Sequence, residues 1–371
     1  MITKLICDDF NSIYLTDKNE LFAFGMNTNK VLGCATNSIT KFKKIDTGIK
    51  EKIVYISKDS DNIFLVTESG EIYISGFTNF SIHIKNRLIS GFEKWNINLK
   101  VKKILKIFDS VYIIDSSNNL FMYKEYNYSL LLHNVKDIQK NIDSLFIFTN
   151  NNKMYTINIS SHTNDGNLKE IKLNFNVKHF SLSNFVVYAI CTKGNLYKLV
   201  NDEFIKIFLL DKKVKYISTE TNNIVLLTQS GELFESIRNN AFIQTFFRPK
   251  SDDLVLGCKN TDFFVRVKFD KPIKSIKCTN SCTSILTENG EIYIKGFNNK
   301  CKYTNKISML STNKYTKMDT KIDNIVDIFV TTKYTLILNN KDELFICGQI
   351  PTRGTASGEE AYIIPEYTKI N

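Results

Sequence analysis

The sequence predicts an all-β fold, a single closed β-propeller of four-stranded blades that spans residues 1–371. Three observations lead to this prediction. A hairpin motif recurs along the whole chain, two further strand candidates lie between successive hairpins, and aromatic and β-branched residues, which favour strands, are abundant. A lone hairpin cannot bury its apolar face, whereas blades packed in a ring bury these faces against one another.

The hairpin motif is clearest in two segments that share nine of eleven residues, TESGEIYISGF at 67–77 and TENGEIYIKGF at 287–297. The plan is an apolar strand, a turn with Gly or Asn, and a second strand that starts with an aliphatic–aromatic pair. Gly and Asn tolerate the positive φ that a tight turn requires. The plan occurs eight times, with second-strand aromatics at Phe22, Tyr73, Phe121, Tyr155, Tyr197, Phe234, Tyr293 and Phe345.

Two more strand candidates separate successive hairpins. The first is short and is expected to begin each unit, as FKKI does at 42–45 and FIKI at 204–207; the second directly precedes the hairpin, as KIVYIS does at 52–57. The chain ends with a further short strand, EYTKIN at 366–371, that no hairpin follows. We therefore expect the C-terminal strand 366–371 to complete the first blade and close the ring, which removes open sheet edges. Several unrelated small β-domains are the alternative.

The segment ELFAFGMNTNKVLG at 20–33 resembles the repeat of the regulator of chromosome condensation (RCC1) family, with its strand, Gly-x-Asn and Leu-Gly ending. GEIYISGF, GEIYIKGF and DELFICGQ carry the same strand and its trailing Gly, which is kept at Gly25, Gly76, Gly296 and Gly348. The resemblance covers nearly the whole chain as a repeat plan. It implies seven blades, whereas the hairpins number eight. It also implies a loop before each hairpin that contains His, and no unit has His there.

This loop is the predicted partner-binding surface. Equivalent loops of successive blades are expected on one face, where seven acidic residues would form an arc. They are Asp8, Asp9, Asp59, Asp61, Asp109, Asp143 and Glu220. The arc would dock a basic partner. The resemblance implies that such loops contact a small Ran-like GTPase and help to expel its nucleotide. The alternative is that Asp and Ser only form turns between strands.

These observations predict a protein–protein interaction propeller, in its most specific form a guanine-nucleotide exchange factor for a Ran-like GTPase. The alternative is a non-catalytic RCC1-like scaffold in a chromatin, cytoskeletal or ubiquitin-ligase assembly. The acidic arc favours exchange, and the missing loop histidines favour the scaffold. An enzyme with its site in the channel mouth is a third reading, although no Walker A motif, nucleophile elbow or HExxH motif is present. Nucleotide exchange, which the resemblance implies, is the only activity that we expect.

Composition narrows the partners. The net charge is +11, but 44 Lys stand against five Arg, and Arg is the residue suited to bidentate recognition of phosphates and bases, so nucleic acid or chromatin is weakly supported. Eight scattered Cys without a CxxC pair predict reduced thiols and no metal or cofactor. Without a signal peptide or a long apolar run, we expect an intracellular monomer, nuclear or cytoplasmic, with no membrane contact.

Two insertions are further candidates. The segment 351–365, with Arg353, Glu359 and Glu360, would be a recognition loop that projects from the last blade, or else a plain linker. The longest gap between hairpins, 241–269, would be an extra strand pair, a wedge inserted into a partner, or an elaborated outer strand.

Overall fold

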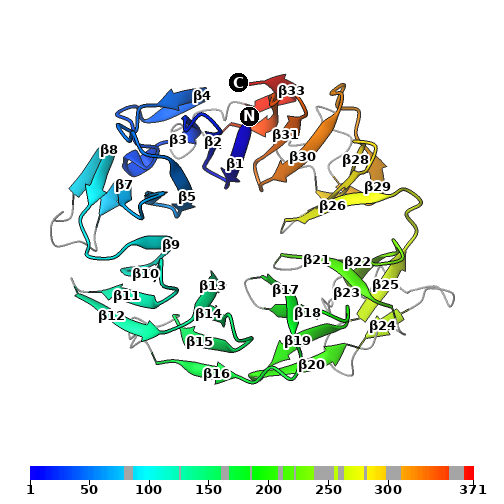
Figure 1. Cartoon of the computed structure of the whole chain (residues 1–371). Helices are drawn as coiled ribbons and strands as arrows, with labels where there is room; N and C mark the ends of the chain where they lie inside the picture. The colour runs from blue at the N-terminus through cyan, green and yellow to red at the C-terminus, as the bar shows by residue number, and fades with distance from the viewer. Residues whose placement is uncertain are drawn as a thin grey trace.

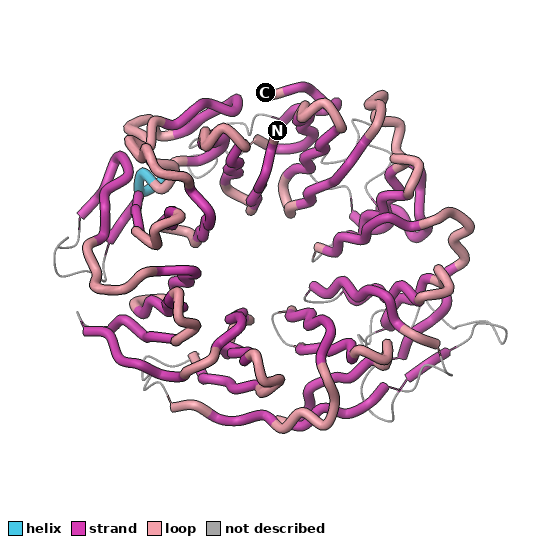
Figure 2. Tube along the Cα trace, viewed as in Figure 1, coloured by secondary structure: helices cyan, strands magenta, loops and turns pink. Residues whose placement is uncertain are grey.

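The computed structural model is a ring of eight antiparallel sheets around a common axis (Figure 1). It describes residues 1–78, 87–124, 127–159, 167–183, 186–207, 212–220, 223–237, 255–257, 263–279, 282–297, 311–350 and 363–371. The prediction of an all-β propeller is confirmed, with the eight blades that the hairpins indicated. The only helix in these ranges is the short 3-10 turn η1 (Thr28–Lys30), which stands out in Figure 2.

Within each blade, the strands are described in order outward from the axis. The innermost strands are β1 (Ile2–Cys7), β5 (Ile53–Lys58), β9 (Val101–Ile107), β13 (Val135–Lys140), β17 (Val177–Leu182), β21 (Val214–Glu220), β26 (Ile273–Cys278) and β30 (Ile325–Val330). The second strands are β2 (Asn11–Thr16), β6 (Asn62–Thr67), β10 (Ser110–Asp115), β14 (Ser144–Thr149), β18 (Val187–Cys191), β22 (Asn223–Thr228), β27 (Cys282–Thr287) and β31 (Tyr334–Asn339).

The outer half of each blade completes the sheet. The third strands are β3 (Leu21–Met26), β7 (Ile72–Thr78), β11 (Leu120–Lys124), β15 (Met154–Asn158), β19 (Leu196–Val200), β23 (Leu233–Ile237), β28 (Ile292–Phe297) and β32 (Leu344–Gln349). The fourth strands are β4 (Ser38–Ile45), β8 (Arg87–Trp95), β12 (Asn127–Leu132), β16 (Lys169–Ile171), β20 (Glu203–Ile207), β25 (Phe263–Val267), β29 (Ser311–Lys317) and β33 (Ile363–Lys369). In the sixth blade β24 (Val255–Gly257) pairs outside β25, so the described part of 241–269 forms an elaborated outer edge.

The hairpin turns follow from local chemistry. In the turn after β6, Gly70 N–H donates to the Thr67 carbonyl at 3.0 Å and Thr67 N–H donates to the Glu71 carbonyl at 3.0 Å. This is a turn closed by one left-handed residue. All eight hairpins have a residue with positive φ at that position: Asn19, Gly70, Asn118, Asn152, Gly194, Gly231, Gly290 and Asp342.

The core consists of layers between blades. The described buried side chains group into eight clusters, one for each pair of neighbouring blades. Because a middle strand is covered on both faces, every residue of β6 and β27 is buried, including the Thr and Ser residues of β27. Each blade therefore depends on both of its neighbours for its stability.

The predicted role of the C-terminal strand is wrong. Residues 366–369 belong to β33, which pairs with β32 in the eighth blade, with Phe345 opposite Lys369. The first blade already has four strands, because β1 supplies its inner strand. The short strands such as FKKI are likewise the outermost strands of the preceding blade, not the first strands of the next. In a circular repeat, the sequence does not indicate which of the four strands is the first strand of a blade. The boundary between one blade and the next was therefore left open.

Side chains close the ring between the last and first blades. A buried cluster joins Tyr14 and Phe24 of the first blade to Leu336 and Ile346 of the eighth. The Tyr334 hydroxyl contacts Ser12 Oγ at 2.8 Å and donates to the Asp8 carbonyl at 2.7 Å. Closure is therefore by packing and hydrogen bonds, and the two chain ends lie close together (Figure 1).

Candidate functional site

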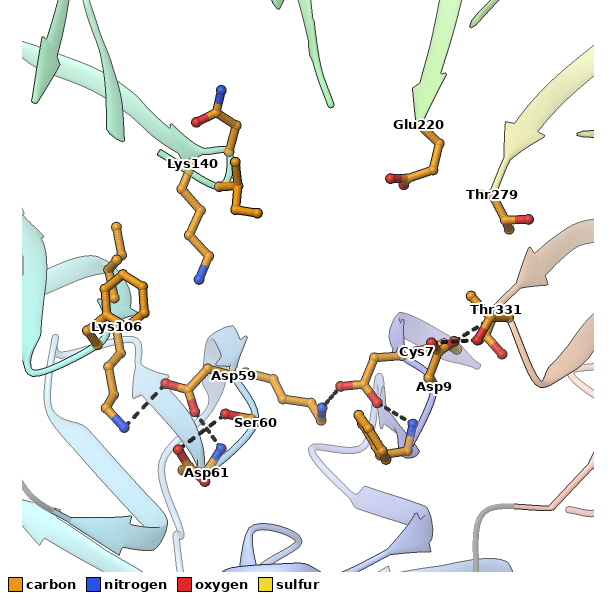
Figure 3. Close-up of a pocket in the computed structure, with 18 of the residues that line it drawn as sticks. Cys7, Asp9, Asp59, Ser60, Asp61, Lys106, Lys140, Glu220, Thr279 and Thr331 are labelled. Carbon is orange, nitrogen blue, oxygen red and sulfur yellow. Dashed lines mark hydrogen bonds and ion pairs between the residues drawn. The ribbon is translucent and has the colours of Figure 1, made fainter. Parts of the chain in front are cut away.

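The loops between the first and second strands meet at one end of the ring. They surround a cavity of about 810 Å³, here called the mouth cavity (Figure 3). Its described lining comes from seven of the eight blades. Five of the seven predicted acidic residues line it: Asp8, Asp9, Asp59, Asp61 and Glu220. Asp109 and Asp143 are exposed on the same set of loops, but their neighbours Phe108 and Ile142 are the residues that line the cavity.

Two of the acids shape their own turns. Asp59 Oδ1 accepts hydrogen bonds from the backbone N–H groups of Asp61, at 2.8 Å, and Asn62, at 2.7 Å. Asp8 Oδ1 accepts from Phe10 and Asn11 N–H in the same way. These bonds are those of an Asx-turn, which explains why the sequence places Asp three residues before a strand.

The other oxygen of each of these two carboxylates faces a lysine of the next blade. Lys58, whose side chain is 3% exposed, forms an ion pair with Asp8. Lys106, whose side chain is 4% exposed, lies 3.6 Å from Asp59 Oδ2 and donates to Asn62 Oδ1 at 2.7 Å. A buried ammonium group needs such partners, because an uncompensated charge is costly away from water. The acidic loops are thus interleaved with lysines that the sequence analysis missed.

Lys140 is the third lysine of this series. Lys58, Lys106 and Lys140 each pair in register with the second residue of the following strand. For Lys140, however, the preceding blade has the apolar Ile107, the last residue of β9, three residues before β10. The corresponding positions before β2 and β6 are Asp8 and Asp59. Its side chain extends into the mouth cavity (Figure 3), and no described residue forms an ion pair with it.

The electrostatic setting of Lys140 is unfavourable for its charge. Burial by the surrounding protein lowers the pKa of Lys140, although the side chain keeps surface exposed in the cavity. Asp59 partly offsets this effect, and Lys106 adds to it. Lys58 and Lys106 each face a carboxylate, whereas no described carboxylate forms an ion pair with Lys140. A carboxylate of a partner that entered the cavity would therefore stabilise the ammonium group of Lys140.

Two other acids bridge blades. Both carboxylate oxygens of Asp9 accept hydrogen bonds from Thr332, one from its N–H and one from its hydroxyl, each at 2.6 Å, and so tie the first blade to the eighth. Asp61 Oδ1 accepts from the Asn29 side chain at 3.1 Å. Asp9 and Asp61, like Asp8 and Asp59, therefore have structural contacts in addition to any role in binding.

Exposed apolar side chains are the second feature that the sequence analysis missed. Phe10, Phe108 and Ile142 line the mouth cavity, and they are 48%, 71% and 50% exposed. Phe108 also has φ = 50°, in the left-handed region, where a bulky residue is strained. In each case the apolar residue is next to an Asp of the loop in the sequence, and this pattern could have indicated that it is exposed.

The thiols at this site are not nucleophiles at neutral pH. Burial raises the pKa of Cys7 and of Cys278 to about 12, so both stay protonated. Within the described ranges, no group of three or more His, Cys, Asp or Glu side chains is arranged to hold a metal ion. No helix in those ranges has the length and apolarity to cross a bilayer. The candidate recognition loop with Arg353, Glu359 and Glu360 lies outside the described residues.

Comparison with known proteins confirms the resemblance to RCC1 repeat proteins. No protein-family model matches the sequence. An RCC1 repeat-containing protein of Dictyostelium discoideum is 28% identical over 138 residues, which is 32% of this chain and only 28% of that protein's length.

Solved structures share the fold across the whole ring. Human WBSCR16 has a TM-score of 0.57 at 10% identity, and the alignment covers 95% of this chain and 94% of that one. Yeast RCC1 (Prp20), solved in complex with Kap60, has a TM-score of 0.55 at 14% identity, with 92% and 81% covered. Prp20p of Saccharomyces cerevisiae, solved in a study of its binding to Gsp1p and histones, has a TM-score of 0.53 at 15% identity, with 92% and 84% covered. Identities this low establish the propeller fold alone.

Proposed function

We propose that this chain is a protein-binding propeller that docks a partner protein at the mouth cavity. The observation that carries the proposal is the set of three exposed apolar side chains, Phe10, Phe108 and Ile142, that line one cavity beside charged groups. Single exposed apolar residues are common on protein surfaces. Apolar side chains gathered at a concave site with a charged rim are typical of interaction sites.

The charged side chains around the mouth cavity suggest a partner that carries both acidic and basic residues. Lys140 offers an ammonium group to a carboxylate of the partner, whereas Asp61, Asp109, Asp143 and Glu220 offer carboxylates to its basic residues. Complementary charges of this kind set orientation and specificity more than total affinity.

A non-catalytic scaffold is the form that this geometry favours. Asp8 and Asp59 already pair with Lys58 and Lys106 of the neighbouring blade, so two members of the predicted acidic arc are engaged inside the protein. The remaining acids do not form a continuous arc, because Lys140 and the apolar loop tips stand among them. We place such a scaffold inside the cell, in the nucleus or the cytoplasm, and we expect it to be monomeric; chromatin is one assembly in which it would serve.

A guanine-nucleotide exchange factor for a Ran-like GTPase is the second candidate. It is favoured by the fold likeness to Prp20, whose structure was studied with Gsp1p binding, and by the acids that remain on this face. Exchange would need no covalent chemistry. The loops would compete for the elements of the GTPase that hold its phosphates and Mg²⁺.

The rate at which a Ran-type GTPase releases fluorescent GDP distinguishes an exchange factor from a non-catalytic scaffold. For an exchange factor we expect acceleration by several orders of magnitude, and we expect the double variant Asp109→Lys and Asp143→Lys to abolish it while the protein stays folded, because both side chains are exposed. For a scaffold we expect no acceleration. A competent GTPase is verified in the same assay by EDTA-stimulated release.

Phe108→Gly is expected to stabilise the protein and weaken docking together. Glycine adopts positive φ without strain, so the free energy of unfolding should rise by about 1 kcal/mol. Removal of an exposed aromatic anchor should weaken partner binding by about tenfold. Denaturant unfolding measures the first effect, and affinity capture from a cell lysate, compared with the unmodified protein, measures the second.

Phe108→Ala is the matched control for this prediction. It removes the same ring but keeps a Cβ at positive φ, so it should weaken capture without the gain in stability. If neither variant changes what the propeller captures, Phe108 takes no part in docking.

A further inference from the structure

The inner strands share a regular feature at the end that lies away from the mouth cavity. Every inner strand has one extra residue, a β-bulge, directly after its first paired residue, as in β13, where Val135 and Asp137 are paired and Lys136 is not. The eight bulge residues are all exposed: Thr3, Val54, Lys102, Lys136, Lys178, Lys215, Lys274 and Val326. Bulges re-aim a side chain out of the regular alternation of a strand.

Lysine occupies this position in five consecutive blades, the third to the seventh. These residues, here called the lysine crescent, are Lys102, Lys136, Lys178, Lys215 and Lys274. The chain has 44 Lys in 371 residues, so composition alone predicts about one Lys among eight positions. Because the bulge lies at the start of each inner strand and the mouth cavity at its end, the crescent is on the opposite face of the ring.

Among the described residues, the crescent lysines do not have the carboxylate partners that lysines of the outer strands have. On the outer strands, Lys44 pairs with Glu20 at 2.7 Å, Lys317 with Glu291 at 2.6 Å and Lys369 with Glu343 at 2.7 Å. In the described part of the chain no ion pair includes a crescent lysine, and the hydrogen bond of Lys102 goes to the neutral Asn118 Oδ1, at 2.8 Å. Like charges placed side by side oppose folding, so an arrangement of this kind suits an external anion.

A crevice between the fourth and fifth blades is lined by two of the crescent lysines. It has a volume of about 200 Å³ and is lined by Lys136, Lys178 and Lys153, among others. The carboxylate that also lines it, that of Asp137, is engaged by Lys103 of the third blade. The crevice therefore presents two crescent lysines on either side of a space of side-chain size.

We propose that the lysine crescent binds an extended acidic segment of a partner protein, with successive carboxylates meeting lysines of successive blades. Cα atoms of β21 come within 8 Å of those of its neighbours β17 and β26, so these inner strands are adjacent on the ring. Alternate side chains of an extended chain point the same way about every 6.6 Å, so such a chain presents a regular row of carboxylates. All five residues are Lys, a compact point charge that suits single carboxylates, whereas Arg is the residue suited to phosphates and bases. The crescent does not depend on the mouth cavity or on the partner proposed there.

The test uses the full chain and a fluorescein-labelled peptide of alternating Glu and Gly, followed by fluorescence anisotropy at low and at physiological ionic strength. We expect salt-sensitive binding that the triple variant Lys136→Glu, Lys178→Glu and Lys215→Glu weakens by at least about tenfold. The matched control is Lys41→Glu, Lys43→Glu and Lys314→Glu, which makes the same change in net charge at exposed lysines of the outer strands β4 and β29. It should change the affinity by less than about twofold.

Three results would overturn the proposal. One is absence of peptide binding by the unmodified protein. Another is equal weakening by the crescent and control variants, which would mean attraction to net charge alone. The third is tighter binding of a DNA or RNA oligonucleotide of equal charge through the same lysines, which would make the crescent a nucleic-acid surface. Because the crescent side chains are exposed, all variants should melt like the unmodified protein, and a Lys→Gln version of the triple variant repeats the test without charge reversal.

Discussion

Gly76→Ala should lower the free energy of unfolding by about 2–5 kcal/mol. Gly76 has φ = 99°, and a Cβ built there would lie 1.9 Å from the backbone carbonyl oxygen of Asp61. The substitution therefore combines backbone strain with an overlap that no side-chain rotation relieves. Denaturant unfolding followed by far-ultraviolet circular dichroism measures the loss.

Gly231→Ala is the control that isolates the strain. Gly231 also has positive φ, 82°, but a Cβ there would meet no atom within 4 Å. It should cost only about 1 kcal/mol. Equal losses at Gly76 and Gly231 would show that the close approach to Asp61 has no energetic effect.

This close approach gives the trailing Gly of the repeat a physical role. At Gly25 a Cβ would lie 2.5 Å from the Phe10 carbonyl oxygen, just as Gly76 meets that of Asp61. In both blades the third strand passes directly behind the loop that bears the candidate site. The Gly that carries the family resemblance therefore supports the loop that carries the proposed function.

Asp59→Ala should destabilise the protein by about 3 kcal/mol or more. It removes the carboxylate that faces the nearly buried Lys106 and also the oxygen that accepts two backbone hydrogen bonds in the turn. Removal of one member of a buried pair is costly because the other charge loses the carboxylate that compensates it. Denaturant unfolding of the full chain measures the effect.

Two further variants divide this loss between its causes. Asp59→Asn keeps an oxygen for the turn and removes only the charge, so its cost should be smaller than that of Asp59→Ala. Adding Lys106→Met to Asp59→Ala should recover part of the stability, because no buried ammonium group then remains. If Asp59→Asn were as stable as the unmodified protein, Asp59 would act only as a turn residue and the ion pair would contribute nothing.

The sequence by itself determined the repeat and its count of eight hairpins. Each hairpin is encoded within about fifteen residues, by a Gly, Asn or Asp at the one position that needs positive φ and by apolar strands on either side, so Gly70 or Asn118 could be identified without knowledge of its neighbours. The hairpin count was therefore right where the resemblance implied seven blades. The phase of the blades was not encoded in this way, and the placement of residues 366–371 was accordingly wrong.

The sequence also located the loops of the candidate site, because Asp marks a turn locally. Only the tertiary structure decided what those loops present. The partners of Asp8 and Asp59 are Lys58 and Lys106, which stand about fifty residues further along and meet them only when successive blades pack. The exposure of Phe108, the position of Lys140 in the mouth cavity, and the alignment of five bulge lysines around the ring likewise depend on how the blades pack. Turn chemistry acts over a few residues and can be read along the chain, whereas charge pairing and exposure depend on which blades become neighbours in space.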